Sequence, residues 1–204
     1  RGGPQEPARL RAVLLREDLF RLYCVGGGAF FVFSSLFNFL PFRLHGPPFH
    51  WPARAVTLLY LSYLVGVAAA PLAGRLSGRI GSGAAMLLGA LVLAGALSLS
   101  LAPSGWAMAA ALALVCAGFF TIHAAAAGAL NHRLQAGRGR ANALYVLFYY
   151  LGGFAGITAS GLAWRRWGWA GVVALAALAL LVPFTTGLAE LRSGRGQPPG
   201  REAP

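Results

Sequence analysis

The segment YLVGVAAAPLAGRLSGRIG, residues 63–81, recurs 87 positions further along the chain as YLGGFAGITASGLAWRRWG, residues 150–168. Seven of the nineteen aligned positions are identical, against roughly two expected by chance in a chain so rich in Gly, Ala and Leu. The identical pairs are Tyr63 and Tyr150, Leu64 and Leu151, Gly66 and Gly153, Ala68 and Ala155, Gly74 and Gly161, Arg79 and Arg166, and Gly81 and Gly168. The repeat indicates that the chain contains two copies of one unit.

Charged residues lie far apart in this chain, and the intervals between them have the length of membrane spans. Only 11% of the residues are charged and 57% are apolar, whereas about a quarter of a soluble domain is charged. Uncharged stretches of about 20 residues are typical of helices that cross a bilayer. The longest uncharged interval, residues 80–132, contains the turn signal Pro103-Ser104-Gly105 near its middle. We therefore expect an all-α membrane protein with six transmembrane helices, at about 22–42, 55–74, 82–101, 106–129, 142–163 and 168–189.

The repeat offset relates these spans in a specific way. A shift of 87 positions carries the first span onto the fourth, the second onto the fifth and the third onto the sixth. The repeated unit therefore has three spans. Because three is odd, consecutive copies enter the membrane from opposite sides, and we expect two inverted three-helix repeats of the kind found in secondary transporters.

The positive charge is distributed as membrane topology requires. All 17 basic residues are Arg, against five acidic residues, a balance that raises nucleic-acid binding as a possibility. With a cytoplasmic N-terminus, thirteen Arg fall inside, and only Arg43, Arg54, Arg165 and Arg166 fall outside. This bias follows the positive-inside rule. We expect both termini to be cytoplasmic, with membrane lipid and no nucleic acid as a partner.

The ends of the chain differ in composition from the spans. Residues 1–18 are rich in Pro, Gly and Arg and begin with Arg rather than Met, so we interpret them as the end of a cytoplasmic linker in a longer protein. Residues 191–204 are rich in Gly, Pro and Arg and are expected to form a disordered cytoplasmic tail. Residues 19–190 then form the six-span unit.

The loop after the second span carries a recognisable pattern. Residues 71–81, PLAGRLSGRIG, resemble the cytoplasmic gate signature G-x-L-x-D-R-x-G-R of the major facilitator superfamily. Gly74, Arg79 and Gly81 match the pattern, whereas Gly78 stands where the family prefers Asp. In the family this Asp caps a helix and pairs with Arg across a moving interface. Without it we expect no charge relay, although the glycines still permit close approach of helices.

Further segments narrow the resemblance and cover residues 19–190. Residues 37–44, 119–123, 147–153 and 164–169 are similar to the YnfM-type branch of bacterial efflux transporters. The resemblance implies the C-terminal six-helix half of a twelve-span carrier of the cytoplasmic (inner) membrane, whose N-terminal half is a partner absent from this chain. It also implies alternating-access transport of a small-molecule substrate, by proton-coupled efflux. The alternative is a half-size six-span protein that dimerises or scaffolds without transport.

Two polar residues within the spans are the leading candidates for substrate contact. Polar groups inside a membrane are costly and face a cavity or another helix. Asn38 lies on the first span and His123 on the fourth, and in the resembled family the first helix of each repeat lines the central cavity. Since no span contains Asp or Glu, His123 is also a candidate for proton linkage. The competing interpretations are an interhelical hydrogen bond for Asn38 and a neutral packed imidazole for His123.

The fifth span combines aromatic and small residues on one helical stripe. Tyr145 and Tyr149 lie at one end, where they would bind an amphipathic solute or anchor the helix at the membrane interface. Gly152, Gly156 and Ser160 lie at the other end and predict a close helix-packing surface. Trp164, Trp167 and Trp169, which follow with Arg165 and Arg166, predict an anchor at the outer surface.

The sequence motifs give little support for an enzymatic function. The nearest match to the G-x-S-G motif of an intramembrane serine protease, residues 75–78, has Arg in place of the first Gly and lies in a basic loop. No Walker loop is present. His45 and His50 have no carboxylate or thiol nearby in sequence, which makes a metal site weak. We expect no enzyme, no cofactor and no metal.

Overall fold

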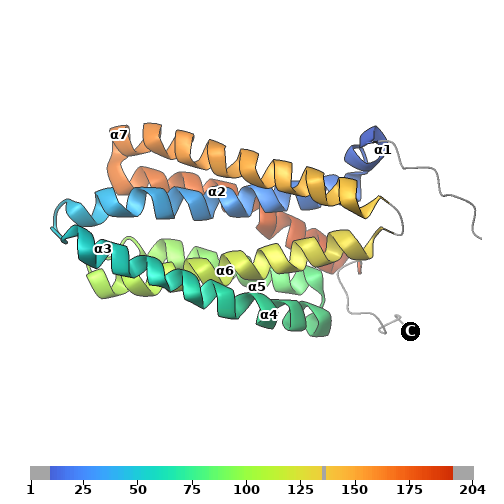
Figure 1. Cartoon of the computed structure of the whole chain (residues 1–204), viewed down its shortest axis with the longest axis horizontal. Helices are drawn as coiled ribbons and strands as arrows, with labels where there is room; N and C mark the ends of the chain where they lie inside the picture. The colour runs from blue at the N-terminus through green and yellow to red at the C-terminus, as the bar shows by residue number, and fades with distance from the viewer. Residues whose placement is uncertain (1–9, 135–136, 195–204) are drawn as a thin grey trace, which may run out of the picture.

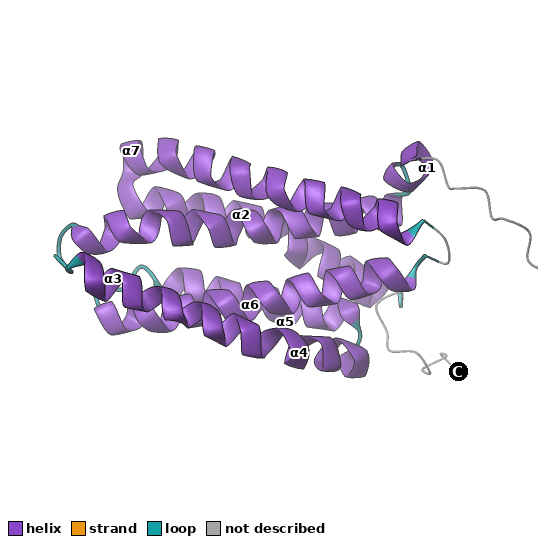
Figure 2. Cartoon of the chain, viewed as in Figure 1, coloured by secondary structure: helices purple, strands orange, loops and turns teal. Residues whose placement is uncertain are grey.

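The described part of the chain is mostly helical, and five helical segments are long enough to cross a membrane. The computed structural model describes residues 10–134 and 137–194, and these residues form no β-strand (Figure 2). The elements are α1 (Leu10–Leu14), α2 (Glu17–His45), α3 (Ala53–Leu59), the short 3-10 helix η1 (Tyr60–Ser62), α4 (Tyr63–Ile80), α5 (Ser82–Leu99), α6 (Gly105–His132) and α7 (Arg138–Arg192). Five segments are long and apolar enough to cross a membrane: α2, α3 through α4, α5, α6 and α7. The predicted all-α membrane class is confirmed, while residues 1–9 of the expected linker and 195–204 of the expected tail lie outside the described residues.

The longest element, α7, consists of two helices joined at Gly168. Its 55 residues would extend about 83 Å if straight, far more than the roughly 30 Å of a bilayer core. Gly168 has φ 60° and ψ −146°, and the chain turns back there (Figure 1). Gly81, its partner in the sequence repeat, also has a positive φ, 89°, and separates α4 from α5. The second helix of each sequence copy therefore ends at a glycine with positive φ.

The turn predicted at Pro103-Ser104-Gly105 is confirmed. α5 ends at Leu99 and α6 begins at Gly105. The backbone N–H of Ala107 donates to the Ser104 hydroxyl oxygen at 3.4 Å, which places Ser104 as the N-cap of α6.

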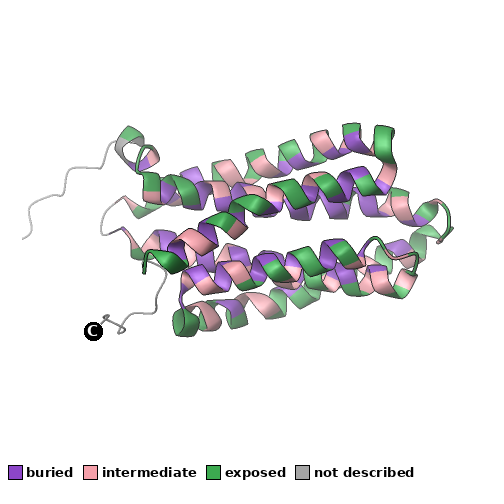
Figure 3. Cartoon of the chain, turned by 180° about the vertical axis from the view of Figure 1, so that it is seen from behind, coloured by how far each residue is buried: buried purple, intermediate pink, exposed green. Residues whose placement is uncertain are grey.

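The helices run side by side, with α2 at the centre and α4 at the edge. The first part of α7 lies beside α2, and α4, α5 and α6 lie on the other side of α2 (Figure 1). The apolar window of α2 is 67% buried, against 11% for α3 through α4, and buried residues concentrate between the helices (Figure 3). The exposed side of η1 and α4 is apolar and includes Leu61 of η1 and Leu64 and Val67 of α4. Such a surface suits contact with lipid or with another membrane segment.

Glycines allow close backbone contact at three helix crossings. A methyl group on Gly152 of α7 would lie 2.1 Å from the carbonyl oxygen of Gly27 on α2. Methyl groups on Gly89 of α5 and Gly118 of α6 would each lie 2.8 Å from the carbonyl oxygen of the other residue. Gly83 of α5 meets the end of α7 in the same way, at 2.7 Å from the Leu191 nitrogen. The close-packing surface predicted around Gly152 is confirmed.

Candidate functional site

Aromatic rings from four helices contact one another in a continuous series, which we call the aromatic belt. The belt comprises Phe30 and Phe33 of α2, Tyr63 of α4, Phe119, Phe120 and His123 of α6, and Tyr149 and Tyr150 of α7. Its tightest contact is the parallel stack of Phe30 on Tyr149, with ring centroids 3.9 Å apart. At the α4 end, Tyr63 meets Phe120 edge to face at 5.5 Å. The belt thus crosses α4, α6, α2 and α7 in turn.

The belt lies near the middle of the length of the helices that carry it. Arg133, which follows α6, contacts the first turn of α2 and the last turn of α7, so these helix ends lie at one end of the bundle, as does the end of α4 (Figure 1). Counted from that end at about 1.5 Å per residue, Phe30, Tyr63, Phe120 and Tyr149 lie about 17 to 26 Å deep. The helices are about 42 Å long on the same scale. This depth is where secondary transporters bind their substrates.

Three of the four predicted site residues come together at one edge of the belt. The Tyr145 hydroxyl lies 3.1 Å from Nδ1 of His123, and the Tyr149 ring lies 5.4 Å from the His123 ring. Tyr145 is only 3% exposed, whereas His123 and Tyr149 are half-buried. The Tyr145 ring fits there because its neighbour is Gly26, where a methyl group would lie 2.7 Å from Cζ of Tyr145. Tyr145 therefore contacts His123 from the buried side and does not form part of the exposed surface of the belt.

Asn38 lies apart from this cluster. Its exposed side chain donates from Nδ2 to the Ser34 carbonyl of its own helix at 2.8 Å. From the same end of the bundle, Asn38 is about 32 Å deep and His123 about 14 Å deep, at about 1.5 Å per residue. A helical stripe indicates the face on which a residue lies but not its neighbours on other helices, so the sequence could not separate the two candidates.

The four residues of the gate pattern have different surroundings. Gly81, with φ 89° and ψ 154°, ends α4. Gly74 and Gly78 are exposed, and methyl groups on them would meet no described residue within 4 Å. Arg79 is exposed and, with Arg75 and Thr121, lines a cavity of about 440 Å³ between α4 and α6. The close helix approach expected at Gly74 and Gly78 is therefore not made by the described residues of this chain.

Replacing Gly81 by Ala is expected to destabilise the turn between α4 and α5. A residue with a Cβ atom at this combination of φ and ψ costs about 1–3 kcal/mol. Thermal unfolding in detergent, followed by size-exclusion chromatography, measures the effect. Gly95→Ala is the matched control, because Gly95 is helical and a methyl group there meets no described atom within 4 Å. Equal melting temperatures for the two variants would contradict the expectation.

Comparison with known proteins places the chain in a family. Residues 5–203 match the family model of the Major Facilitator Superfamily. The chain belongs to the major facilitator superfamily. This confirms the family indicated by the gate pattern, and the family consists of membrane transport proteins rather than enzymes.

Two individual relatives support the same family assignment. The inner membrane transport protein YnfM of Escherichia coli K12 is 37% identical over 155 residues, covering 76% of this chain and 37% of the relative. The MFS-type transporter YybF of Bacillus subtilis 168 is 30% identical over 175 residues, covering 81% of this chain and 41% of the relative. The chain thus spans about two-fifths of the length of the curated relatives it matches. The predicted resemblance to YnfM is confirmed.

A solved structure from the superfamily supports the fold. A crystal structure of the peptide transporter POT in complex with sulfate superposes with a TM-score of 0.74 at 19% identity. The match covers 87% of this chain and 38% of that chain. The described helices of this chain therefore share their arrangement with part of that transporter.

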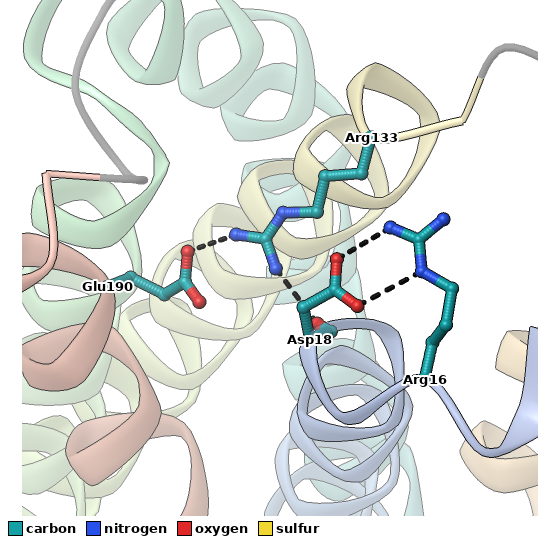
Figure 4. Close-up of polar contacts among 4 residues, drawn as sticks. All are labelled: Arg16, Asp18, Arg133 and Glu190. Atoms are coloured by element: carbon teal, nitrogen blue, oxygen red, sulfur yellow. Dashed lines mark hydrogen bonds and ion pairs between the residues drawn. The ribbon is translucent and has the colours of Figure 1, made fainter.

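An ion cluster at one end of the bundle was not identified from the sequence. Figure 4 shows Arg133 between Glu190 of α7 and Asp18 of α2. Arg133 pairs with the Glu190 carboxylate and donates from Nη1 to the Asp18 carbonyl oxygen at 2.8 Å. Arg16 binds the Asp18 carboxylate through two nitrogens, at 2.8 and 3.1 Å. Since Glu190 is 3% exposed, the Arg133–Glu190 pair is shielded from solvent, whereas the Arg16–Asp18 pair is exposed.

The tryptophans predicted to anchor the chain at the outer membrane surface differ in their burial. Trp167 is exposed, whereas Trp169 is buried. The Trp169 indole donates to the Ser100 carbonyl oxygen at 2.9 Å, which ties the second part of α7 to the end of α5. Trp169 is therefore a packing residue, and the interpretation of it as an interface anchor was wrong.

Proposed function

We propose that this chain is the C-terminal six-helix half of a major facilitator carrier that moves a small solute across the bacterial inner membrane by alternating access, as a proton-coupled exporter. The observation that carries this proposal is the aromatic belt, which lies at mid-depth and has His123 at one edge. The coverage of about two-fifths of each relative supports a half carrier. The loss of the gate acid at Gly78 supports the C-terminal half, because degeneration of this motif is typical of the second half in the resembled family.

We further propose that residues 19–190 cross the membrane six times as two inverted three-helix repeats, with both termini in the cytoplasm. Matched contacts support this arrangement. A methyl group on Gly66 would lie 2.3 Å from the Phe120 ring, and one on its repeat partner Gly153 would lie 2.5 Å from the Phe30 ring. In each case the second helix of one sequence copy accommodates a ring from the first helix of the other copy. The positive φ of both Gly81 and Gly168 is a second correspondence.

In the proposed mechanism, the belt is one wall of the substrate pathway and the N-terminal half supplies the other. His123 and Tyr149 contact the solute, and Tyr145 holds His123 in place. Asn38, closer to the opposite end of α2, contacts the solute on its way through. The unoccupied space around Gly74 and Gly78 lets a helix of the N-terminal half approach closely at the cytoplasmic gate beside Arg79.

His123→Gln tests the central residue of this proposal. Gln keeps a hydrogen-bonding group but cannot take up a proton near neutral pH. A hydrogen bond between neutral groups contributes about 0.5–1.5 kcal/mol, so the altered contact should reduce transport by up to about tenfold, and loss of the titratable imidazole should flatten the pH profile. Transport is measured in vesicles that contain the full carrier, with and without a proton gradient. The control is His45→Gln, since His45 is exposed at the end of α2; a variant at His123 with unchanged transport and pH profile would refute its role.

A further inference from the structure

We infer that the solute is a planar aromatic molecule with a hydrogen-bond acceptor and no net charge on the part that meets the belt. The inference rests on the proposed function and specifies the class of substrate. Three features of the belt support it: the continuity of its rings, the orientation of the His123 proton, and the absence of charge.

The belt presents rings to whatever lies beside it. Tyr63 is 45% exposed and Tyr150 is 64% exposed, and between them Phe30, Phe120 and Tyr149 are half-buried. The rings support one another in both stacked and edge-to-face contacts. A further aromatic ring can extend such a series in the same geometries, and each favourable ring pair improves affinity beyond the burial of apolar area. A saturated molecule of the same shape gains only the burial.

The contact with Tyr145 assigns the proton of neutral His123 to Nε2. Within residues 10–134 and 137–194, the Tyr145 hydroxyl has no hydrogen-bond partner besides Nδ1 of His123. The large majority of buried hydroxyls are hydrogen-bonded, and a phenol donates more readily than it accepts, so we assign Tyr145 as the donor and Nδ1 as the acceptor. In a neutral imidazole the other nitrogen, Nε2, then carries the proton. A solute that binds Nε2–H must offer an acceptor, such as an aryl carbonyl or ether oxygen.

The belt offers no partner to a charge. Residues 22–42, 55–74, 82–101, 106–129 and 141–164, which include the belt, contain no Asp, Glu, Lys or Arg. A carboxylate would therefore be buried without a counter-ion, which is costly. The faces of the rings attract cations, so an aromatic ammonium ion is the competing class. His123 favours the neutral acceptor because an ammonium ion would meet a hydrogen-bond donor at that edge of the belt.

Competition binding to the purified full-length carrier, with both halves present, distinguishes these classes. The probes are coumarin and 1-indanone, which are planar aromatic carbonyl compounds, their saturated counterparts octahydrocoumarin and octahydro-1-indenone, and the cation benzyltrimethylammonium. We expect the aromatic carbonyl compounds to bind at least about tenfold more tightly than the saturated ones and than the cation. Equal binding of aromatic and saturated compounds, or preference for the cation, overturns the inference.

Single variants assign the effect to the belt. Tyr149→Leu and His123→Leu should each weaken coumarin binding about tenfold, the ratio expected for loss of one ring contact or one hydrogen bond. Phe154→Leu is the matched control, because Phe154 is a highly exposed aromatic residue of the same helix that has no contact with the belt rings. Coumarin affinity that is unchanged in both belt variants contradicts the inference.

Tyr145 has a separate readout because it is a positioning residue. In Tyr145→Phe, ¹⁵N NMR of His123 should show a shift from predominantly protonated Nε2 to a mixture of the two neutral tautomers, and coumarin should bind several-fold more weakly. An unchanged tautomer population contradicts the assignment. The proposed function can fail independently of this inference. If the carrier binds coumarin selectively but transports no solute, the inferred site is supported and the transport function is refuted. If it transports only saturated solutes, the transport function is supported and the inferred substrate class is refuted.

Discussion

Gly152→Ala is expected to prevent stable folding of the helix bundle. The added methyl group would lie 2.1 Å from the Gly27 carbonyl oxygen, with two further backbone atoms of Gly27 at 2.5 Å. All three atoms belong to the backbone, so no flexible side chain can move aside and the α2 and α7 helices must separate. Overpacking of a well-packed interior costs about 1–3 kcal/mol, and a clash between two backbones should lie at or above the upper limit. The monodisperse fraction after detergent extraction, and its melting temperature, measure the effect.

Gly95→Ala provides the comparison. Gly95 is also a helical glycine in a transmembrane segment, but a methyl group there meets no described atom within 4 Å. Because Ala is the better helix former, by up to about 1 kcal/mol, this variant should be as stable as the original or slightly more stable. If both variants lost the same amount of folded protein, the crossing at Gly27 and Gly152 would not be the reason.

Glu190→Ala is expected to be the most damaging single change among the charged residues. It leaves the Arg133 guanidinium, whose side chain is 14% exposed, without its carboxylate partner at the junction of α2, α6 and α7. Removing one partner of a buried ion pair costs about 3–5 kcal/mol, much of it from the remaining uncompensated charge. The prediction is checked by thermal unfolding of the full carrier and by its expression level.

Two comparisons isolate the buried charge as the cause. Glu17→Ala removes the partner of Arg21, but that carboxylate is 78% exposed, so we expect a loss of at most about 1 kcal/mol. The double variant Glu190→Leu with Arg133→Leu removes both charges and should recover much of the stability lost in Glu190→Ala. A double variant as unstable as Glu190→Ala would show that packing, rather than an unpaired charge, explains the loss.

The sequence predicted the helical segments well because charge and turn residues mark where a chain can leave a membrane. The uncharged interval 22–42 lies within α2, and Pro103-Ser104-Gly105 fell at the observed turn. At residues 60–62 a short 3-10 segment interrupts the expected second helix, a local change that hydrophobicity does not signal. The glycine-rich stripe from Gly152 was correctly assigned to helix packing because small residues have few other uses in a span.

The sequence was less informative about contacts between helices. The pair Arg133 and Glu190 is separated by 57 positions, and neither residue is distinguished by a local motif. The same limit applies to the site: the helical stripe placed Tyr145 and Tyr149 together, but only the tertiary packing buries one ring against Gly26 and leaves the other in the belt. Trp169 was misassigned for the same reason, since its hydrogen-bond partner Ser100 lies on another helix.

The uncharged character of the belt has a consequence for how membrane voltage acts on the carrier. Moving one elementary charge through 100 mV contributes about 2.3 kcal/mol, but in the proposed alternating-access mechanism the spans of this chain carry no fixed charge through the field while His123 is neutral. A proton on His123 is the single way for the spans of this half to become charged near neutral pH. Any electrogenic step assigned to this half would therefore indicate protonation of the His123 imidazole.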